Sequence, residues 1–134
     1  MGAWGTGVLE NDGAWDLLNE LEGSPSIARV LEALRNAANG DDYLEREGGE
    51  EVHAAAEMVA AALGRPLDGV DAKLTALAVA LPELAEEREL ALDALDGVMD
   101  TKRSETAELW EDSEDYDDWL EVMADLKGRL QGDG

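Results

Sequence analysis

One stretch of the sequence has the residue types and spacing of a carboxylate–histidine metal site. Glu50 and His53 are three residues apart and Glu57 follows four residues later, so a helix would present all of them on one face. Di-iron carboxylate bundles take a Glu-x-x-His pair from each of two helices. His53 is the only histidine in the chain, so a second pair would have to come from a dimer. We therefore expect His53 to be a solvated or salt-bridged side chain.

Acidic pairs at helical spacing are a second possible source of metal chemistry. All-α nucleotide pyrophosphohydrolases hold magnesium with such carboxylates from facing helices, and the sequence contains Glu83-x-x-Glu86, Glu111-x-x-Glu114 and Glu114-x-x-Asp117. At the acidic content of this chain, about eight such pairs are expected by chance. No lysine or arginine close to these pairs is set apart for a phosphate. A metal-dependent all-α nucleotide hydrolase is therefore an alternative function rather than the leading one.

Three further motifs lack a required part. The acidic stretch 112–118 has neither the glycine nor the bidentate glutamate that an EF-hand loop needs. Gly2 and Thr6 match an N-myristoylation signal, but the acidic chain has no polybasic segment to complete a membrane anchor. Gly5-Thr6-Gly7 is not followed by the lysine of a phosphate-binding loop, and the chain has no cysteine. We predict no metal and no cofactor, and the motifs favour a protein that is not an enzyme.

The strongest feature of the composition is its negative charge. The chain has 33 Asp and Glu residues against 10 Lys and Arg, which gives a formal net charge of -23. Such a surface repels nucleic acids and anionic membranes and attracts basic proteins. The same charge also keeps proteins soluble, and some organisms in high salt carry it on most of their proteins. A structural or regulatory domain whose acidity serves solubility alone is therefore a second alternative.

One acidic cluster contains aromatic residues as well. Within residues 111–121, six acids from Glu111 to Asp118 gather around Tyr116 and Trp119. An acidic patch with aromatic anchors is typical of protein-binding hot spots, whereas a solvated turn between helices would explain the acids alone. The predicted partner-binding residues are Glu111, Asp112, Glu114, Asp115, Tyr116, Asp117 and Asp118.

The spacing of apolar residues predicts an all-α fold. We expect a compact single-domain bundle of six to seven helices over residues 1–134, because no segment alternates long enough for a strand. An irregular glycine-rich arm over residues 1–10, with Trp4 as its anchor, precedes the bundle, and a frayed tail over residues 131–134 follows it. The helices with their caps are expected at residues 11–23, 24–39, 50–63, 70–81, 82–99, 104–110 and 115–130.

Several boundaries and faces follow from local signals. Asn11 or Asp12 caps the first helix, Ser24 caps the second with Pro25 at its first position, and Ser104 opens the sixth. Residues 40–50 are polar and rich in glycine, which predicts a connecting loop. The third helix is alanine-rich and is expected to bury one side, lined by Val52, Ala56, Val59 and Leu63.

The N-terminal residues carry a resemblance to a known family. The run Gly2-Ala3-Trp4-Gly5-Thr6-Gly7, followed by Glu10-Asn11-Asp12, Ala14 and Asp16, resembles the opening of the bacterial family known as domain of unknown function 4259. Its members begin with Gly-x-Trp-Gly-x-Gly, an aromatic residue and Asn-Asp-x-Ala-x-Asp. Ser104-Glu105, Glu108-Leu109-Trp110 and Trp119 are similar as well. The sequence departs from the pattern at Leu9, where an aromatic residue is usual, and at Gly13.

The resemblance covers the whole chain and implies a bacterial, cytoplasmic helical domain, with no activity or catalytic residue to transfer. We interpret its motif residues as structural, serving as caps and anchors. The alternative is that the glycine-rich arm frames a binding groove, with Asp12 and Asp16 on one side of a helix. The motif residues interpreted in this way are Trp4, Gly5, Gly7, Asn11, Asp12, Asp16, Trp110 and Trp119.

These observations lead to one functional hypothesis. The sequence begins without a secretory signal and its longest apolar stretch, 54–63, is too short to span a bilayer, so we expect a cytoplasmic protein. The leading hypothesis is a non-enzymatic interaction protein whose acidic surface binds a basic protein. An immunity-type protein that neutralises a basic toxin and a mimic of nucleic acid are its concrete forms.

Overall fold

The computed structural model describes residues 6–38 and 43–132 of the chain. Within these ranges the chain folds into seven α-helices and one short 3-10 helix, and no strand forms beyond an isolated bridge between Leu44 and Ser104. The all-α prediction is therefore confirmed. No helix in the described part of the chain is long and apolar enough to cross a membrane. The elements are α1 (Asp12–Gly23), α2 (Ile27–Ala38), α3 (Arg46–Ala62), α4 (Ala72–Ala80), η1 (Pro82–Glu86), α5 (Arg88–Met99), α6 (Glu105–Glu111) and α7 (Tyr116–Gln131).

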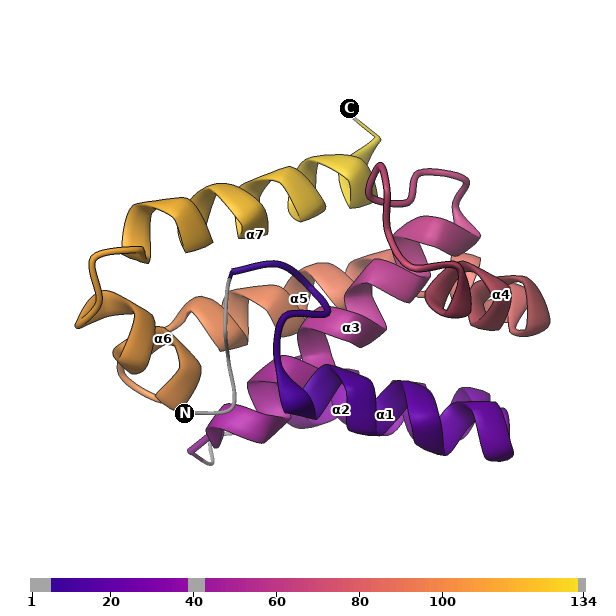
Figure 1. The fold of residues 1–134 in the computed structure, drawn as a ribbon, viewed down its shortest axis with the longest axis horizontal. Helices are drawn as coiled ribbons and strands as arrows, with labels where there is room; N and C mark the ends of the chain where they lie inside the picture. The colour runs from indigo at the N-terminus through magenta and orange to yellow at the C-terminus, as the bar shows by residue number, and fades with distance from the viewer. Residues whose placement is uncertain (1–5, 39–42, 133–134) are drawn as a thin grey trace.

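Helix α3 lies at the centre of the bundle. In Figure 1 it passes between α7 on one side and α1 and α2 on the other, and it contacts every other helix named above. The prediction that α3 buries a single side is wrong. Its residues from Val52 to Ala60 are all buried, because small alanine side chains let helices approach from several directions at once.

Helix α3 begins at Arg46, four residues before the predicted start at residue 50. Its first turn is held by α6. The Arg46 backbone N–H donates to Glu105 Oε1 at 2.8 Å, and Thr106 Oγ1 donates to the Arg46 carbonyl at 3.2 Å. Gly49 suggested a loop, but in the structure it permits the close contact between α3 and α6. A Cβ at this position would lie 2.3 Å from Thr106 Oγ1. The predicted connecting loop over residues 40–50 is therefore wrong from Arg46 onward, where the chain is helical. Residues 39–42 lie outside the described residues.

Side-chain caps begin several of the other helices. The Asn11 side chain accepts the Ala14 N–H at 2.8 Å in α1, and the Ser104 side chain accepts the Ala107 N–H at 3.2 Å in α6. For α2 the predicted cap is wrong. Ser26 rather than Ser24 accepts the N–H of Arg29, at 3.2 Å, so Pro25 precedes the helix instead of opening it.

The single helix predicted over residues 82–99 is divided in two. Pro82 begins the 3-10 helix η1, and α5 starts only at Arg88. In a 3-10 helix residues three positions apart share a face. Leu81 and Leu84 are both buried, and this tighter turn directs them to the same side.

Helix α7 extends one residue into the predicted tail. It ends at Gln131, and Gly132 adopts the left-handed conformation, φ 89°, that commonly terminates a helix. Residues 133–134 lie outside the described residues. The long helices α5 and α7 run in opposite directions, so the turn between α6 and α7 lies at the opposite end of the molecule from the start of α5 (Figure 1).

Candidate functional site

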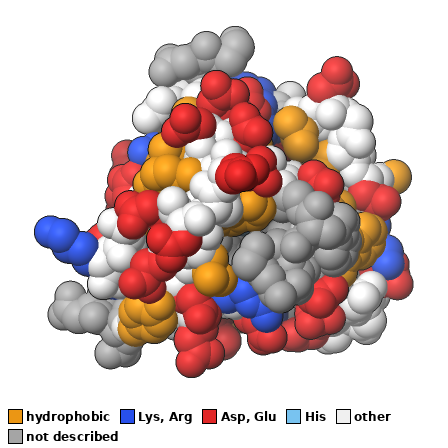
Figure 2. Space-filling view, turned by 60° about the vertical axis from the view of Figure 1, so that its left-hand side comes forward, with side chains coloured by type: hydrophobic (Ala, Val, Ile, Leu, Met, Phe, Trp, Pro, Cys, Tyr) orange, Lys and Arg blue, Asp and Glu red, His pale blue; other side chains and the backbone are white. Residues whose placement is uncertain are grey.

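The predicted acidic cluster forms the connection between α6 and α7. All six of its carboxylate side chains are exposed, and we call them the acidic turn: Glu111, Asp112, Glu114, Asp115, Asp117 and Asp118. Figure 2 brings this side of the molecule toward the viewer and shows Asp and Glu side chains spread across the face with few Lys or Arg among them. The segment from Arg103 to Lys127 has ten acidic residues between those two cations and no other lysine or arginine.

The acidic turn has no cationic partner within the described part of the chain. The basic side chains that form ion pairs among the described residues pair with acids elsewhere: Arg29, Arg46, Lys73, Lys127 and Arg129. Arg29 binds Glu20 and Glu51, and Lys127 binds Asp96 at 2.5 Å. The negative potential over the turn is therefore uncompensated by the protein itself, which is the condition for attracting an external cation or basic protein.

An aromatic stack supports the acidic turn from below. Trp119 stacks on Trp110 with ring centroids 6.5 Å apart and on Tyr116 with centroids 6.2 Å apart. Both tryptophans are buried, so they belong to the core and hold the start of α7 against α6. Of the three rings only Tyr116 is partly exposed, and it alone can contact a partner.

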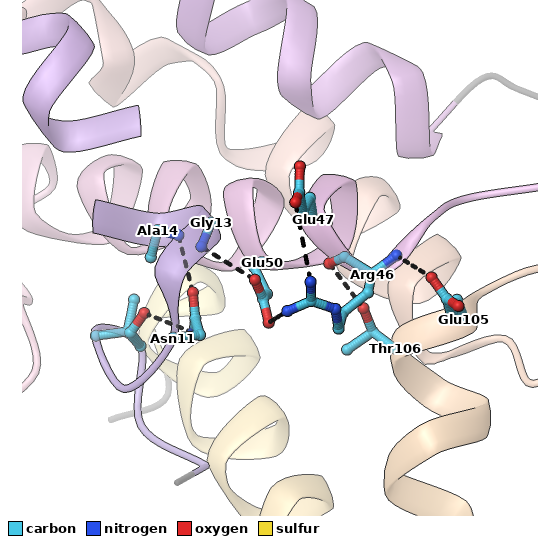
Figure 3. Close-up of polar contacts among 9 residues, drawn as sticks. Asn11, Gly13, Ala14, Arg46, Glu47, Glu50, Glu105 and Thr106 are labelled. Carbon is cyan, nitrogen blue, oxygen red and sulfur yellow. Dashed lines mark hydrogen bonds and ion pairs between the residues drawn. The ribbon is translucent and has the colours of Figure 1, made fainter. Parts of the chain in front are cut away.

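Asn11 of the N-terminal motif lies near a junction of three helix starts, those of α1, α3 and α6 (Figure 3). Asn11 is buried and, besides capping α1, donates from Nδ2 to the Val8 carbonyl at 3.3 Å. Asp12 and Asp16 are exposed on α1. Trp4 and Gly5 lie outside the described residues. Asn11 is therefore a structural cap. Its side chain accepts one backbone N–H and donates to one backbone carbonyl.

Glu50 takes part in the same junction. Its Oε1 accepts the Gly13 N–H at 3.0 Å, and its Oε2 lies 3.4 Å from Arg46 Nη1 (Figure 3). Burial raises the pKa of Glu50, although the Gly13 N–H and Arg46 both act to lower it. Oε1 of Glu50 thus joins α1 to α3, and Oε2 pairs with Arg46 within α3, so this carboxylate has a structural role at the junction.

His53 is buried rather than solvated or salt-bridged, so the prediction made for it is wrong. Its exposed fraction is 5%, and no group among the described residues forms a hydrogen bond with its ring. Burial, and secondarily the charge of Arg129, lowers the pKa of His53 to about 4. The ring is therefore neutral at neutral pH. Helix α3 buries it because this helix is surrounded on all sides.

Two cavities meet at His53. The smaller has a volume of about 20 Å³, enough for one water molecule, and lies among Asn11, Glu50, Trp110 and Trp119. The larger has a volume of about 420 Å³, and we call it the α3–α7 groove. Its lining includes Thr6 and Gly7 of the N-terminal arm, Leu67, and side chains of α3 and α7.

A buried ion pair joins α3 to α7 along this groove. Arg129 binds Glu57 with two parallel contacts, Nη1 to Oε2 at 2.6 Å and Nη2 to Oε1 at 2.9 Å. Asp125 Oδ2 accepts from Arg129 Nε at 2.9 Å, and Glu57 Oε2 also accepts the Leu67 N–H at 2.9 Å. The sequence placed Glu57 on the His53 face but gave no sign of Arg129, because the two partners are 72 residues apart.

The predicted magnesium pairs do not form one site. Glu83 and Glu86 belong to η1, which follows α4, whereas Glu111, Glu114 and Asp117 belong to the acidic turn at the other end of the molecule (Figure 1). Over residues 6–38 and 43–132, no three His, Asp or Glu side chains are grouped so that they could hold a metal ion.

Comparison with known proteins gives one relationship. No curated protein and no solved structure matches the chain. A family model described as Domain of unknown function (DUF4259) matches residues 2–122, which include the N-terminal motif, the α1–α3 junction and the acidic turn. The chain therefore belongs to the DUF4259 family.

Proposed function

We propose that this protein is a non-enzymatic, cytoplasmic interaction protein that binds a basic partner protein through the acidic turn. The observation that carries the proposal is the set of six exposed carboxylates that no described lysine or arginine neutralises. An immunity-type protein that neutralises a basic toxin, or a mimic of nucleic acid, would present such a surface. Nucleic acids and anionic membranes are not partners in this proposal, because a net charge of -23 repels them.

The surroundings of the turn support binding to a protein. Complementary charge accelerates encounter and selects the partner, while affinity comes from a few anchored residues. Tyr116 is a partly exposed aromatic residue inside the acidic turn, and its stacking on Trp119 limits its motion. An aromatic side chain that is already held in place loses little conformational entropy when a partner covers it.

The test compares two variants with the same change of charge. The turn variant replaces Glu114, Asp115, Asp117 and Asp118 with Ser. The control variant replaces four exposed acids of η1 and α5 with Ser, at the other end of the molecule: Glu83, Glu86, Glu89 and Asp93. Each protein is used to capture proteins from host lysate at low salt, the bound material is released with a salt step, and mass spectrometry identifies it.

We expect the wild type and the control variant to retain the same basic protein and the turn variant to lose it. With the purified partner, the salt dependence of the dissociation constant should be flatter for the turn variant than for the control. Equal retention of the partner by both variants would refute the assignment to the acidic turn. An eluate without any basic protein would count against the proposed function itself.

A further inference from the structure

The buried ring of His53 faces open space in place of a protein partner. The exposed fraction of His53 is 5%, and no described residue forms a hydrogen bond with its ring. No enclosed polar side-chain atom in the described residues lacks a partner, so the unbonded ring nitrogens must be open to the cavities that His53 lines. A buried polar group normally has a hydrogen-bond partner, and a ligand in the cavity would supply the one missing here.

The wall of the α3–α7 groove opposite His53 is acidic. Asp118, Glu121 and Asp125 follow one another along one side of α7, and all three line the groove. Asp125 already binds Arg129, whereas no described cation pairs with Asp118 or Glu121. The rise of an α-helix separates these positions by about 4.5 Å and about 6 Å along its axis. The groove therefore presents two carboxylates, of Asp118 and Glu121, that no described cation neutralises.

Apolar side chains line the same groove. Val122 and Leu67 both line the groove and are partly buried. The Glu57 carboxylate in its floor is neutralised by Arg129, and the neutral ring of His53 does not repel a cation. A groove lined by both apolar side chains and carboxylates complements a chain of methylene groups that carries ammonium groups.

We propose that the α3–α7 groove binds a linear aliphatic polyamine, with Asp118 and Glu121 pairing with its ammonium groups and His53 accepting a hydrogen bond from one of them. The methylene segments pack on Val122 and Leu67. This ligand site is separate from the binding of a basic protein by the acidic turn and does not depend on that function. Only Asp118 belongs to both surfaces.

The experiment uses the single histidine as its reporter. The full-length protein is labelled with ¹³C-histidine, so that the only Cε1–H signal comes from His53. Spermidine is titrated into the sample at pH 7, and NaCl and MgCl₂ are titrated in parallel at matched ionic strength. A tetralysine peptide forms a further arm, because it carries primary ammonium groups at the ends of side chains on a peptide backbone.

We expect spermidine to shift the His53 signal with a saturating curve, and the salts to leave it nearly unchanged. In an Asp118→Asn, Glu121→Gln variant the midpoint should rise about tenfold or more, because two charge-assisted contacts are lost. A Glu83→Gln, Glu86→Gln variant removes the same charge from η1 and should keep the wild-type midpoint. Each variant is first checked for a wild-type circular dichroism spectrum.

Four results would overturn the proposal. The first is a His53 signal that responds to spermidine no more than to NaCl. The second is a response to MgCl₂ that equals the response to spermidine, because the site would then recognise charge alone. The third is equal midpoints for the two double variants. A tetralysine midpoint below that of spermidine would likewise overturn it, because the groove would then select lysine side chains rather than a free polyamine.

Discussion

At the scale of single residues, the polar groups buried in α3 are the unusual feature of this protein. Glu57 is 1% exposed and depends on Arg129 for charge compensation. A buried carboxylate left without its partner carries a desolvation penalty of several kcal/mol, which the bidentate geometry of Arg129 offsets. His53 lacks such compensation, and its burial disfavours the protonated ring. The two residues therefore respond differently to a change in pH.

The prediction at this scale concerns pH and His53. The ordinary pKa of 6.5 is lowered in the fold to about 4. Above pH 6.5 the ring is neutral in both folded and unfolded chains, whereas between about 4 and 6.5 only the unfolded chain binds the proton. His53 should therefore destabilise the fold progressively as pH falls through this window, by about 3 kcal/mol at most, with no further loss below it.

The measurement compares wild type with His53→Gln in urea denaturation at several pH values and fixed ionic strength. The free energy of unfolding of the wild type should fall relative to that of the variant between pH 7 and pH 4. The many carboxylates titrate in both proteins, so their effect cancels in the difference. A difference that does not vary with pH would show that His53 titrates normally in the fold.

At the scale of elements, packing around α3 depends on close approaches between helices. Helices α2 and α5 also contact each other beside it. At their contact a Cβ on Gly97 would lie 2.3 Å from the carbonyl oxygen of Ala37. Gly128 in α7 has no atom within 4 Å of the corresponding position. Close packing thus requires glycine at position 97, whereas position 128 has room for a Cβ.

The element-scale prediction uses this contrast. Gly97→Ala should lower the free energy of unfolding by about 1–3 kcal/mol, because α2 and α5 must move apart and backbone cannot yield as a flexible side chain would. Gly128→Ala should raise it by about 0.5–1 kcal/mol, because alanine has the higher helix propensity and meets no atoms. Urea denaturation of both variants measures the two effects. Shifts of the same sign would show that the α2–α5 contact is looser than described.

At the scale of the whole molecule, charge dominates. Two of the basic residues stabilise contacts between helices: Arg46 pairs with Glu50 at the α1–α3 junction, and Arg129 joins α7 to α3. These two cations neutralise buried acids, and most of the exposed carboxylates in the described part of the chain form no ion pair. The folded state therefore concentrates negative charge that the unfolded chain spreads out.

Salt should consequently stabilise the protein. Raising NaCl from about 10 mM to about 150 mM shortens the screening length from about 30 Å to about 8 Å, which weakens repulsion between exposed carboxylates. We expect the melting temperature to rise by about 5 °C, as measured by circular dichroism at 222 nm, which corresponds to about 1 kcal/mol. KCl should act equally, because screening does not distinguish the two ions. A flat or falling melting temperature would mean that the charges are already compensated.

Helix boundaries show which features the local sequence can predict and which depend on distant contacts. The caps of α1 and α6 were predicted because an Asn or Ser side chain bonds to an N–H only a few residues away. The start of α3 was missed, because Arg46 is held by Glu105 of a distant helix. The division at Pro82 was missed for a related reason, since burial of Leu84 favours a 3-10 turn.

The sequence by itself determined the helical class, the family and the exposed acidic turn. Apolar spacing, caps and a net charge of -23 are all properties of neighbouring residues or of composition. Only the tertiary structure decided the environment of His53, the pairing of Glu57 with Arg129 and the groove between α3 and α7. Those features depend on which helices surround α3, and contacts between residues as far apart as 57 and 129 arise only once the bundle has packed.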